Sequence, residues 1–172
     1  MRKIAFSLAA AFLATTGNGA AQIGPLDKIS VGGVGPVRFG MTLVQAAAAG
    51  APLAADPHTA ATCFHAHSAG EPGLSFLIRN GQIVRADVMK PSRLKTIEGF
   101  KLGDKEIDVV SFYAATSGGA SDVPLSDSSD ITLVASPEFS RGTIPRLVYE
   151  ITDKAGVFAI HAGAVSRDLR GC

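Results

Sequence analysis

Residues 74–88 alternate hydrophobic and polar side chains at period two, the pattern of strands with one buried face. The alternation is interrupted by Asn80-Gly81, the dipeptide most typical of a two-residue hairpin turn. We therefore predict two strands joined by this turn, with one apolar face that covers a core. The residues on that apolar face are Leu74, Phe76, Ile78, Val84, Ala86 and Val88.

Shorter runs predict the remaining strands. "TCFHAHS" (62–68) alternates in the same way ahead of the hairpin, and "KISVGG" (28–33) indicates an extra strand near the start. In the second half we predict strands at "DITLVAS" (130–136), "PRLVYEI" (145–151) and "VFAIHAG" (157–163). Apolar residues fill adjacent positions in the last two, which predicts central strands or strands buried on both faces.

Two short helices are predicted from their start signals. In "RFGMTLVQAAAAG", Thr42 and Gln45 have the spacing of a capping box, and the final glycine ends the helix after about two turns. The second helix is predicted to run from Asp104, as its N-cap, to about Ala115. Helices of this length gain little stability alone, so each needs a sheet to pack against.

The same pattern occurs twice along the chain. With an offset of 63 residues, "VGPVRFGMTLVQAAAA" aligns with "IEGFKLGDKEIDVVSF", so that Gly40 meets Gly103. Two occurrences indicate a duplicated unit, since a solenoid needs at least about three repeats. We predict an α+β fold, with one compact domain made of two tandem copies of a short helix packed on an antiparallel sheet. The copies cover about residues 30–92 and 93–172.

This pattern resembles that of two families of bacterial proteins. A "RFGMT" segment followed by a short helix and strands is similar to the unit of the SmpA/OmlA (BamE-like) outer-membrane lipoproteins, which carry one copy. It also resembles the β-lactamase inhibitory proteins, which carry two copies in tandem. The residues of the motif are Phe39, Gly40, Met41 and Thr42. The resemblance implies a helix-plus-sheet fold that binds without chemistry. It implies no particular partner, because neither the lipid-anchor cysteine nor the inhibitors' contact loops are matched here.

The N-terminus has the pattern of a secretory signal peptide. Arg2 and Lys3 precede an apolar run, and the small residues before position 22 suit cleavage. The run is shorter than the roughly 20 residues of a membrane span, and no cysteine near the cut would carry a lipid anchor. We expect residues 1–21 to be removed and Gln22 to begin a soluble protein, periplasmic or secreted, without a membrane anchor.

The mature chain has almost no net charge. Without residues 1–21, fourteen basic side chains remain against fifteen acidic ones. This balance gives no electrostatic reason to expect nucleic acid or an anionic membrane as a partner. A chain of this size is long enough to bury one hydrophobic core.

The two cysteines are Cys63 and the C-terminal residue Cys172. In an exported protein such an even pair predicts one disulfide. Closing a loop of this length would stabilise the fold by about 4–5 kcal/mol in the chain-entropy model, and it would fix the C-terminus.

Histidines supply the strongest signal of site chemistry. On a strand Cys63, His65 and His67 point to one face, so a zinc or copper site is one alternative, with a fourth ligand from His58 or His161. The predicted disulfide would remove the cysteine from such a site. A small exported hydrolase is a second alternative, but "GLSFL" lacks the second glycine of the Gly-x-Ser-x-Gly motif. We therefore expect neither enzymatic activity nor a cofactor.

The polar face of the predicted sheet is the candidate binding surface. It carries Arg79, Arg85 and Asp87, with His65 and His67 beside them. A protein suits this face better than a glycan does, because sugar sites usually stack on an aromatic ring and the chain has no tryptophan and only two tyrosines. We expect an inhibitor-like binding module that recognises a protein of the cell envelope or a secreted protein.

Overall fold

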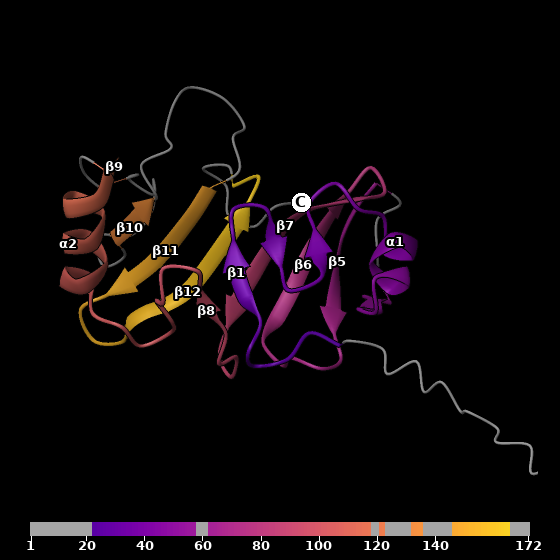
Figure 1. The fold of residues 1–172 in the computed structure, drawn as a ribbon, viewed down its shortest axis with the longest axis horizontal. Coiled ribbons are helices and arrows are strands. Elements are labelled where there is room, and N and C mark those ends of the chain that lie inside the picture. Colours follow the sequence, from indigo (N-terminus) through magenta and orange to yellow (C-terminus); the bar gives the residue numbers. More distant parts are fainter. Residues whose placement is uncertain (1–21, 58–61, 118–120, 123–131, 136–145, 166–172) are drawn as a thin grey trace, which may run out of the picture.

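The computed structural model describes residues 22–57, 62–117, 121–122, 132–135 and 146–165. These residues form two β-sheets and two α-helices, so the predicted α+β class is confirmed. Figure 1 shows the large sheet across the middle of the molecule, with one helix toward each end.

An eight-stranded antiparallel sheet forms one layer of the fold. Four of its strands come from the first half of the chain and four from the second, and the two groups meet where Arg85–Met89 pairs with Ala159–Gly163. We call this pairing the central seam. In spatial order the strands are β4 (Leu53–Ala55), β5 (Cys63–Ser68), β6 (Leu74–Arg79), β7 (Gln82–Met89), β12 (Gly156–Gly163), β11 (Arg146–Thr152), β10 (Thr132–Ala135) and β9 (Ser121–Asp122).

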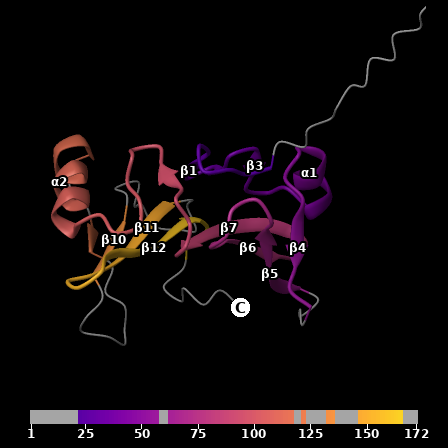
Figure 2. The same cartoon turned by 90° about the horizontal axis from the view of Figure 1, so that it is seen from below.

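A smaller sheet of four short strands lies over one face of the large sheet (Figure 2). Helices α1 (Leu43–Ala48) and α2 (Glu106–Ser117) lie on the same side, toward opposite ends of the large sheet. The strand predicted at "KISVGG" is confirmed as part of this smaller layer. In spatial order its strands are β3 (Val37–Arg38), β2 (Gly33–Val34), β1 (Lys28–Ser30) and β8 (Lys95–Thr96).

The hydrophobic core fills the space between these layers. Both sheets and both helices contribute buried side chains to one continuous cluster. Burial of this apolar surface is the main force that holds the short strands and helices in place. Representative members of the core are Ile29, Val34, Ala46, Phe76, Ala86, Val88, Val109, Tyr149, Ile160 and Ala162.

Helix α1 begins as the sequence predicts. Thr42 Oγ1 accepts a hydrogen bond from the Gln45 amide at 3.2 Å, and the Gln45 side chain accepts one from the Thr42 amide at 2.8 Å. The capping box is therefore confirmed. The helix ends before Gly50, whose φ of 90° lies in the left-handed region that favours glycine.

The start predicted for helix α2 is wrong. The Asp104 carboxylate accepts a hydrogen bond from the Lys101 amide at 2.9 Å, and the Lys101 ammonium contacts it as well. The carboxylate therefore closes the preceding turn and does not cap the helix. The helix itself begins at Glu106 and ends at Ser117, beyond the predicted end at Ala115.

The hairpin of β6 and β7 is confirmed, including its turn. Asn80 and Gly81 both have positive φ, 51° and 77°, as a type I′ turn requires. One detail of the prediction is wrong, because Val84 is only half-buried and Ile83 fills a core position in its place. A register shift within the hairpin moves the start of β7 out of strict alternation, which is the effect of a β-bulge.

The last two strands are the ones that the sequence predicted to be central or buried on both faces. Strand β12 lies in the middle of the large sheet, beside β7. In β11 the adjacent residues Val148 and Tyr149 are both buried, although they point to opposite faces. The prediction is confirmed for both strands.

Matching hydrogen bonds hold the segment before each helix to the large sheet. The Gly40 amide donates a hydrogen bond to the Ile83 carbonyl, and the Ile83 amide donates one to the Met41 carbonyl, both at 2.8 Å. In the second half the Gly103 amide donates to the carbonyl of Val157 at 2.7 Å, and the Val157 amide donates to the residue after Gly103 at 2.9 Å. The two glycines have φ values of 92° and 90°, a conformation that favours glycine.

Aromatic rings fix helix α2 to the large sheet. Phe100 packs edge-on against Phe112 and Tyr149, with ring centroids 5.3 and 5.9 Å apart. The hydroxyls of Tyr113 on α2 and Tyr149 on β11 share a hydrogen bond of 3.0 Å. Burial raises the pKa of Tyr149 to about 12, and it raises the pKa of Tyr113 as well.

Replacing Thr42 with alanine should lower the free energy of unfolding by about 0.5–2 kcal/mol, because the Gln45 amide loses its acceptor. Urea denaturation would record this change as a lower midpoint at an unchanged slope. Thr42→Ser keeps a hydroxyl at the cap and is the matched control, with a midpoint close to that of the native protein. Identical midpoints for all three proteins would show that the cap contributes nothing.

The ionisation of the two tyrosines should report on the burial of their pair, because the chain contains no others. In the folded protein no phenolate should form near pH 10, the ordinary tyrosine pKa, and the first step should come at about pH 12. Ultraviolet absorbance measures this titration. The denatured chain is the control and should titrate near pH 10. The same step in the folded protein would mean that water reaches the hydroxyls.

Candidate functional site

Charged side chains gather at the central seam, on the face of the large sheet opposite the core. The neighbouring residues Ala86, Val88, Ile160 and Ala162 face the core, so the residues between them on β7 and β12 face the other way. The charged residues are Arg85 and Asp87 on β7, His161 on β12 and Glu150 on β11, which we call the seam cluster. Asp87 and His161 are directly paired in register.

His161 is bound on both sides by carboxylates. Its Nδ1 lies 2.6 Å from Asp87 Oδ1, and its Nε2 lies 2.8 Å from Glu150 Oε1. Ionised carboxylates only accept hydrogen bonds, so the form of the ring that bonds to both of them is the imidazolium cation, with a proton on each nitrogen. Burial alone would lower the pKa of His161, but the hydrogen bonds and charges of Asp87 and Glu150 outweigh it and hold the pKa above its ordinary value.

Asp87 is shared between two cations. Arg85 Nε lies 2.7 Å from its Oδ1, and Arg85 Nη2 donates to its Oδ2 at 3.0 Å. Burial alone would raise the pKa of Asp87, but the hydrogen bonds and charges of His161 and Arg85 hold it below its ordinary value. With Glu150, the cluster contains two cations and two anions, so its charges balance.

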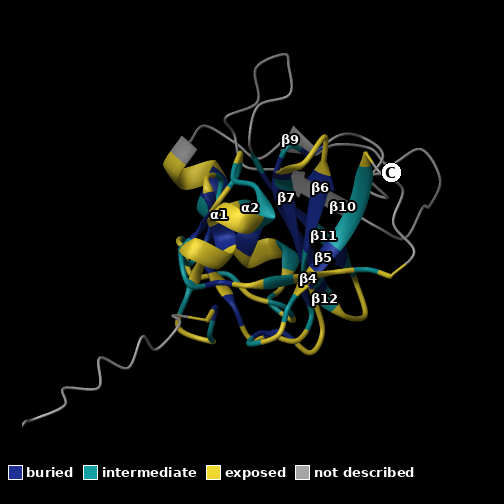
Figure 3. Ribbon diagram, turned by 90° about the vertical axis from the view of Figure 1, so that its right-hand side faces the viewer, coloured by how far each residue is buried: buried dark blue, intermediate teal, exposed yellow. Residues whose placement is uncertain are grey.

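The structure corrects the predicted exposure of Arg85 and Asp87. Both lie opposite the core as predicted, yet they are only 2% and 7% exposed. Leu77 and Val148 share that face and are buried too, and the middle strands of the large sheet are largely buried in Figure 3. Alternation shows which residues share a face but not whether that face is covered. Arg85 and Asp87 therefore cannot be direct contacts of a partner.

The other three predicted surface residues are accessible to solvent. His67 is half exposed, and its Nε2 lies 2.9 Å from Asp56 Oδ1. His65 is 31% exposed, with its Nε2 3.7 Å from Asp87 Oδ2 at the edge of the seam cluster. Arg79 is exposed on the neighbouring strand. We call Asp56, His65, His67 and Arg79 the histidine patch.

The two histidines of the patch are not grouped as metal ligands. Each contacts a different carboxylate, His65 that of Asp87 and His67 that of Asp56. Within the ranges that the structure describes, no three or more histidine, cysteine or acidic side chains are placed to hold a metal ion. His58 and Cys172 lie outside those ranges, so the predicted disulfide stays a prediction.

Sequence reasoning missed Glu150 and the meeting of His161 with Asp87. His161 and Asp87 are 74 positions apart in the sequence, and the pairing of β7 with β12 brings them together. One signal was present, since "PRLVYEI" contains Glu150 and "VFAIHAG" contains His161, each within a strand predicted to be central. A charged side chain inside a central strand needs a partner on the neighbouring strand.

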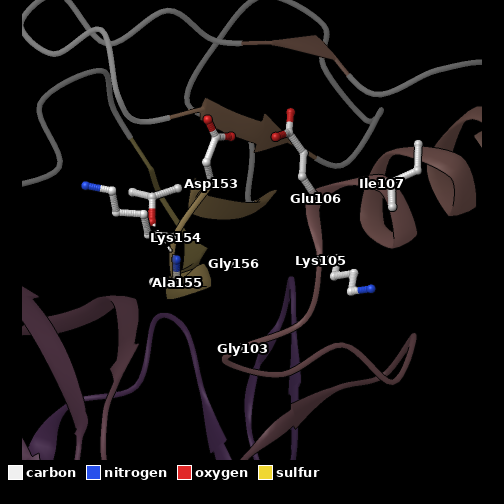
Figure 4. A pocket seen from close by; sticks show the side chains of 9 residues that line it. Gly103, Lys105, Glu106, Ile107, Asp153, Lys154, Ala155 and Gly156 are labelled. Atoms are coloured by element: carbon white, nitrogen blue, oxygen red, sulfur yellow. Dashed lines mark hydrogen bonds between the residues drawn. The ribbon is translucent and has the colours of Figure 1, made fainter.

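A pocket of about 460 Å³ lies between the start of α2 and the turn that joins β11 to β12 (Figure 4). Its charged lining residues include Lys105 on the helix side and Lys154 on the turn. In Figure 4 their ammonium groups point to opposite sides, away from one another. The two lysines therefore do not converge on a common ligand.

No family model, curated protein or solved structure matches this chain. Among the described residues, no helix is long and apolar enough to cross a membrane.

Replacing Asp87 with alanine should lower the free energy of unfolding by about 3–5 kcal/mol, because Arg85 and His161 would remain buried without their shared anion. Asp56→Ala is the matched control. It removes the other aspartate paired with a histidine, but that pair is exposed and should contribute only about 0–1 kcal/mol. Denaturant titration of both variants measures the difference. Equal losses would contradict a structural role specific to the seam cluster.

Proposed function

We propose that the protein is an exported binding module without enzymatic activity, which recognises another protein of the cell envelope or a secreted protein through its histidine patch. The observation that carries this proposal is the division of its polar side chains into two groups. The charges of the seam cluster are buried and paired with one another, whereas the histidine patch beside it is accessible. Only the second group can contact a partner.

The state of His161 argues against hydrolysis at the seam. A general base needs an imidazole nitrogen with an available lone pair, and each nitrogen of this ring is held within hydrogen-bond distance of a carboxylate. His67 with Asp56 could orient a nucleophile, and Ser75 stands opposite His67 in register. In the described part of the chain, however, no hydrogen bond joins Ser75 to His67, and such a bond is the first requirement of a triad.

Two observations support the interpretation of the chain as two tandem helix-plus-sheet units. In each half of the large sheet, the last strand in the chain order lies at the central seam and earlier strands lie progressively farther out, from β7 to β4 on one side and from β12 to β9 on the other. The segments before the two helices, 63 residues apart, make the same backbone hydrogen bonds at Gly40 and Gly103. This arrangement favours the resemblance to the β-lactamase inhibitory proteins, which carry two such units and bind a protein.

The composition of the histidine patch favours a protein partner over a glycan. It offers two imidazoles, a guanidinium and a carboxylate, and it contains no phenylalanine, tyrosine or tryptophan on which a sugar ring could stack. Arginine is also among the residues that contribute most to protein interfaces. Export remains part of the proposal, since residues 1–21 lie outside the described residues.

Substitutions in the patch should reduce the capture of one specific protein. The mature chain, with His67→Ala or Arg79→Ala as patch variants, would be immobilised and exposed to the extracytoplasmic proteins of its own host. Lys105→Ala/Lys154→Ala, at the opposite end of the molecule, is the control variant. A genuine partner is retained by the native and control proteins and recovered in smaller amount with the patch variants.

The captured protein would then be purified and its affinity measured by calorimetry. We expect each patch substitution to weaken binding by about tenfold, which corresponds to roughly 1.4 kcal/mol and is within the range of interface hot spots. If the patch variants bind as tightly as the native protein, the patch is not the binding surface. Turnover of the captured molecule by the native protein would contradict the absence of enzymatic activity.

A further inference from the structure

The central seam is where the two halves of the large sheet are joined. Among the described strands of that sheet, β7 and β12 are the only pair that joins the first half of the chain to the second. Asp87 and His161 face each other across this pairing, and Glu150 reaches the same imidazole from β11. One protonated ring thus joins three adjacent strands.

Loss of a proton from His161 would break this arrangement in two ways. A neutral imidazole has a single N–H, so either Asp87 or Glu150 would lose its hydrogen bond and face a lone pair. The buried charges would also change from balanced to a net negative charge, which is costly away from water. Both effects act where β7, β12 and β11 meet, away from the outer strands of the large sheet.

We propose that the proton which His161 holds between Asp87 and Glu150 fastens the seam, and that its loss lets β7 and β12 separate locally while the outer strands stay paired. An alkaline pH would then open the large sheet locally, at the pairing of β7 with β12. This inference is independent of the proposed binding function, because it concerns the joint between the halves and not the histidine patch.

The charged groups around the ring support this direction of response. Among the described residues, Asp87 and Arg85 face it from β7, Glu150 from β11, and His65 reaches Asp87 from β5. Arg146 stands on the same face of β11, next to Gly163 in register. The carboxylates, which contact the ring directly, raise the pKa of His161, so the cationic form persists in the folded protein above the ordinary value of 6.5.

The sign of the pH dependence follows from this raised pKa. Below about pH 6.5 the ring is protonated whether the seam is closed or open, so the full stabilisation is present. As the pH rises toward and through the raised pKa that His161 has in the folded state, the proton no longer stabilises the closed seam relative to the open one. On the acidic side, the contribution of Asp87 is lost only as the pH falls through its own lowered pKa.

Hydrogen exchange of the native protein tests the proposal. Between about pH 6.5 and the pKa of His161, protection factors of amides in Arg85–Met89 and Ala159–Gly163 should fall by up to roughly tenfold per pH unit. Amides between β5 and β6 are the internal reference and should keep their protection. A parallel fall in both regions would overturn the proposal, since the proton would then stabilise the fold as a whole. Constant protection in both would overturn it too.

Nitrogen NMR of the imidazole supplies a second test that does not depend on exchange. Both nitrogens of His161 should be protonated at pH 7, with one titration step above 6.5. Glu150→Gln keeps an acceptor oxygen but removes the charge, so it should shift this step, and the loss of seam protection with it, to lower pH. His67→Gln, in the exposed pair, is the control and should shift neither. A neutral His161 at pH 7, or an unshifted step in Glu150→Gln, would refute the proposal.

Discussion

Asp87 is the residue on which the middle of the large sheet depends. It accepts from His161 and from Arg85, and all three side chains are buried. Taking ions out of water costs several kcal/mol for each ion, and that cost is offset only when every charge is paired. Because side chains alternate along a strand, a slip of β12 by one residue would turn His161 toward the core and leave the aspartate without this cation. The cluster therefore sets the register of the seam as well as balancing its charges.

Local signals in the sequence predicted much of the fold. Asn80-Gly81 marks its hairpin because both residues tolerate positive φ, and Thr42 with Gln45 marks its helix because two backbone amides need acceptors. The failures come from competition between neighbouring groups. Asp104 was expected to cap α2, but its carboxylate accepts a hydrogen bond from the Lys101 amide instead. Ile83 replaced Val84 in the core because a bulge shifted the alternation, and no residue type announces that bulge.

The candidate site was less predictable than the fold. The sequence placed His65, His67, Arg79, Arg85 and Asp87 on one face, and the two histidines, Arg85 and Asp87 do lie near one another in space. It could not divide them into buried and accessible groups, because burial depends on what covers the second face of the sheet. Nor could it bring Glu150 and His161 to Asp87, since that meeting depends on which strands are neighbours. The proposed binding function rests on this division, which only the structure supplies.

The central position of β7 has a consequence for any shortened form of the chain. In the complete fold its backbone pairs with β6 on one side and with β12 on the other. A fragment ending after β7 would present a row of unsatisfied amides and carbonyls along one edge. It would also lack His161, which contacts Asp87 in the complete fold. Such an edge is a template for pairing with another strand. A second copy of the same fragment could supply that strand, so the isolated first half would self-associate instead of remaining a monomer.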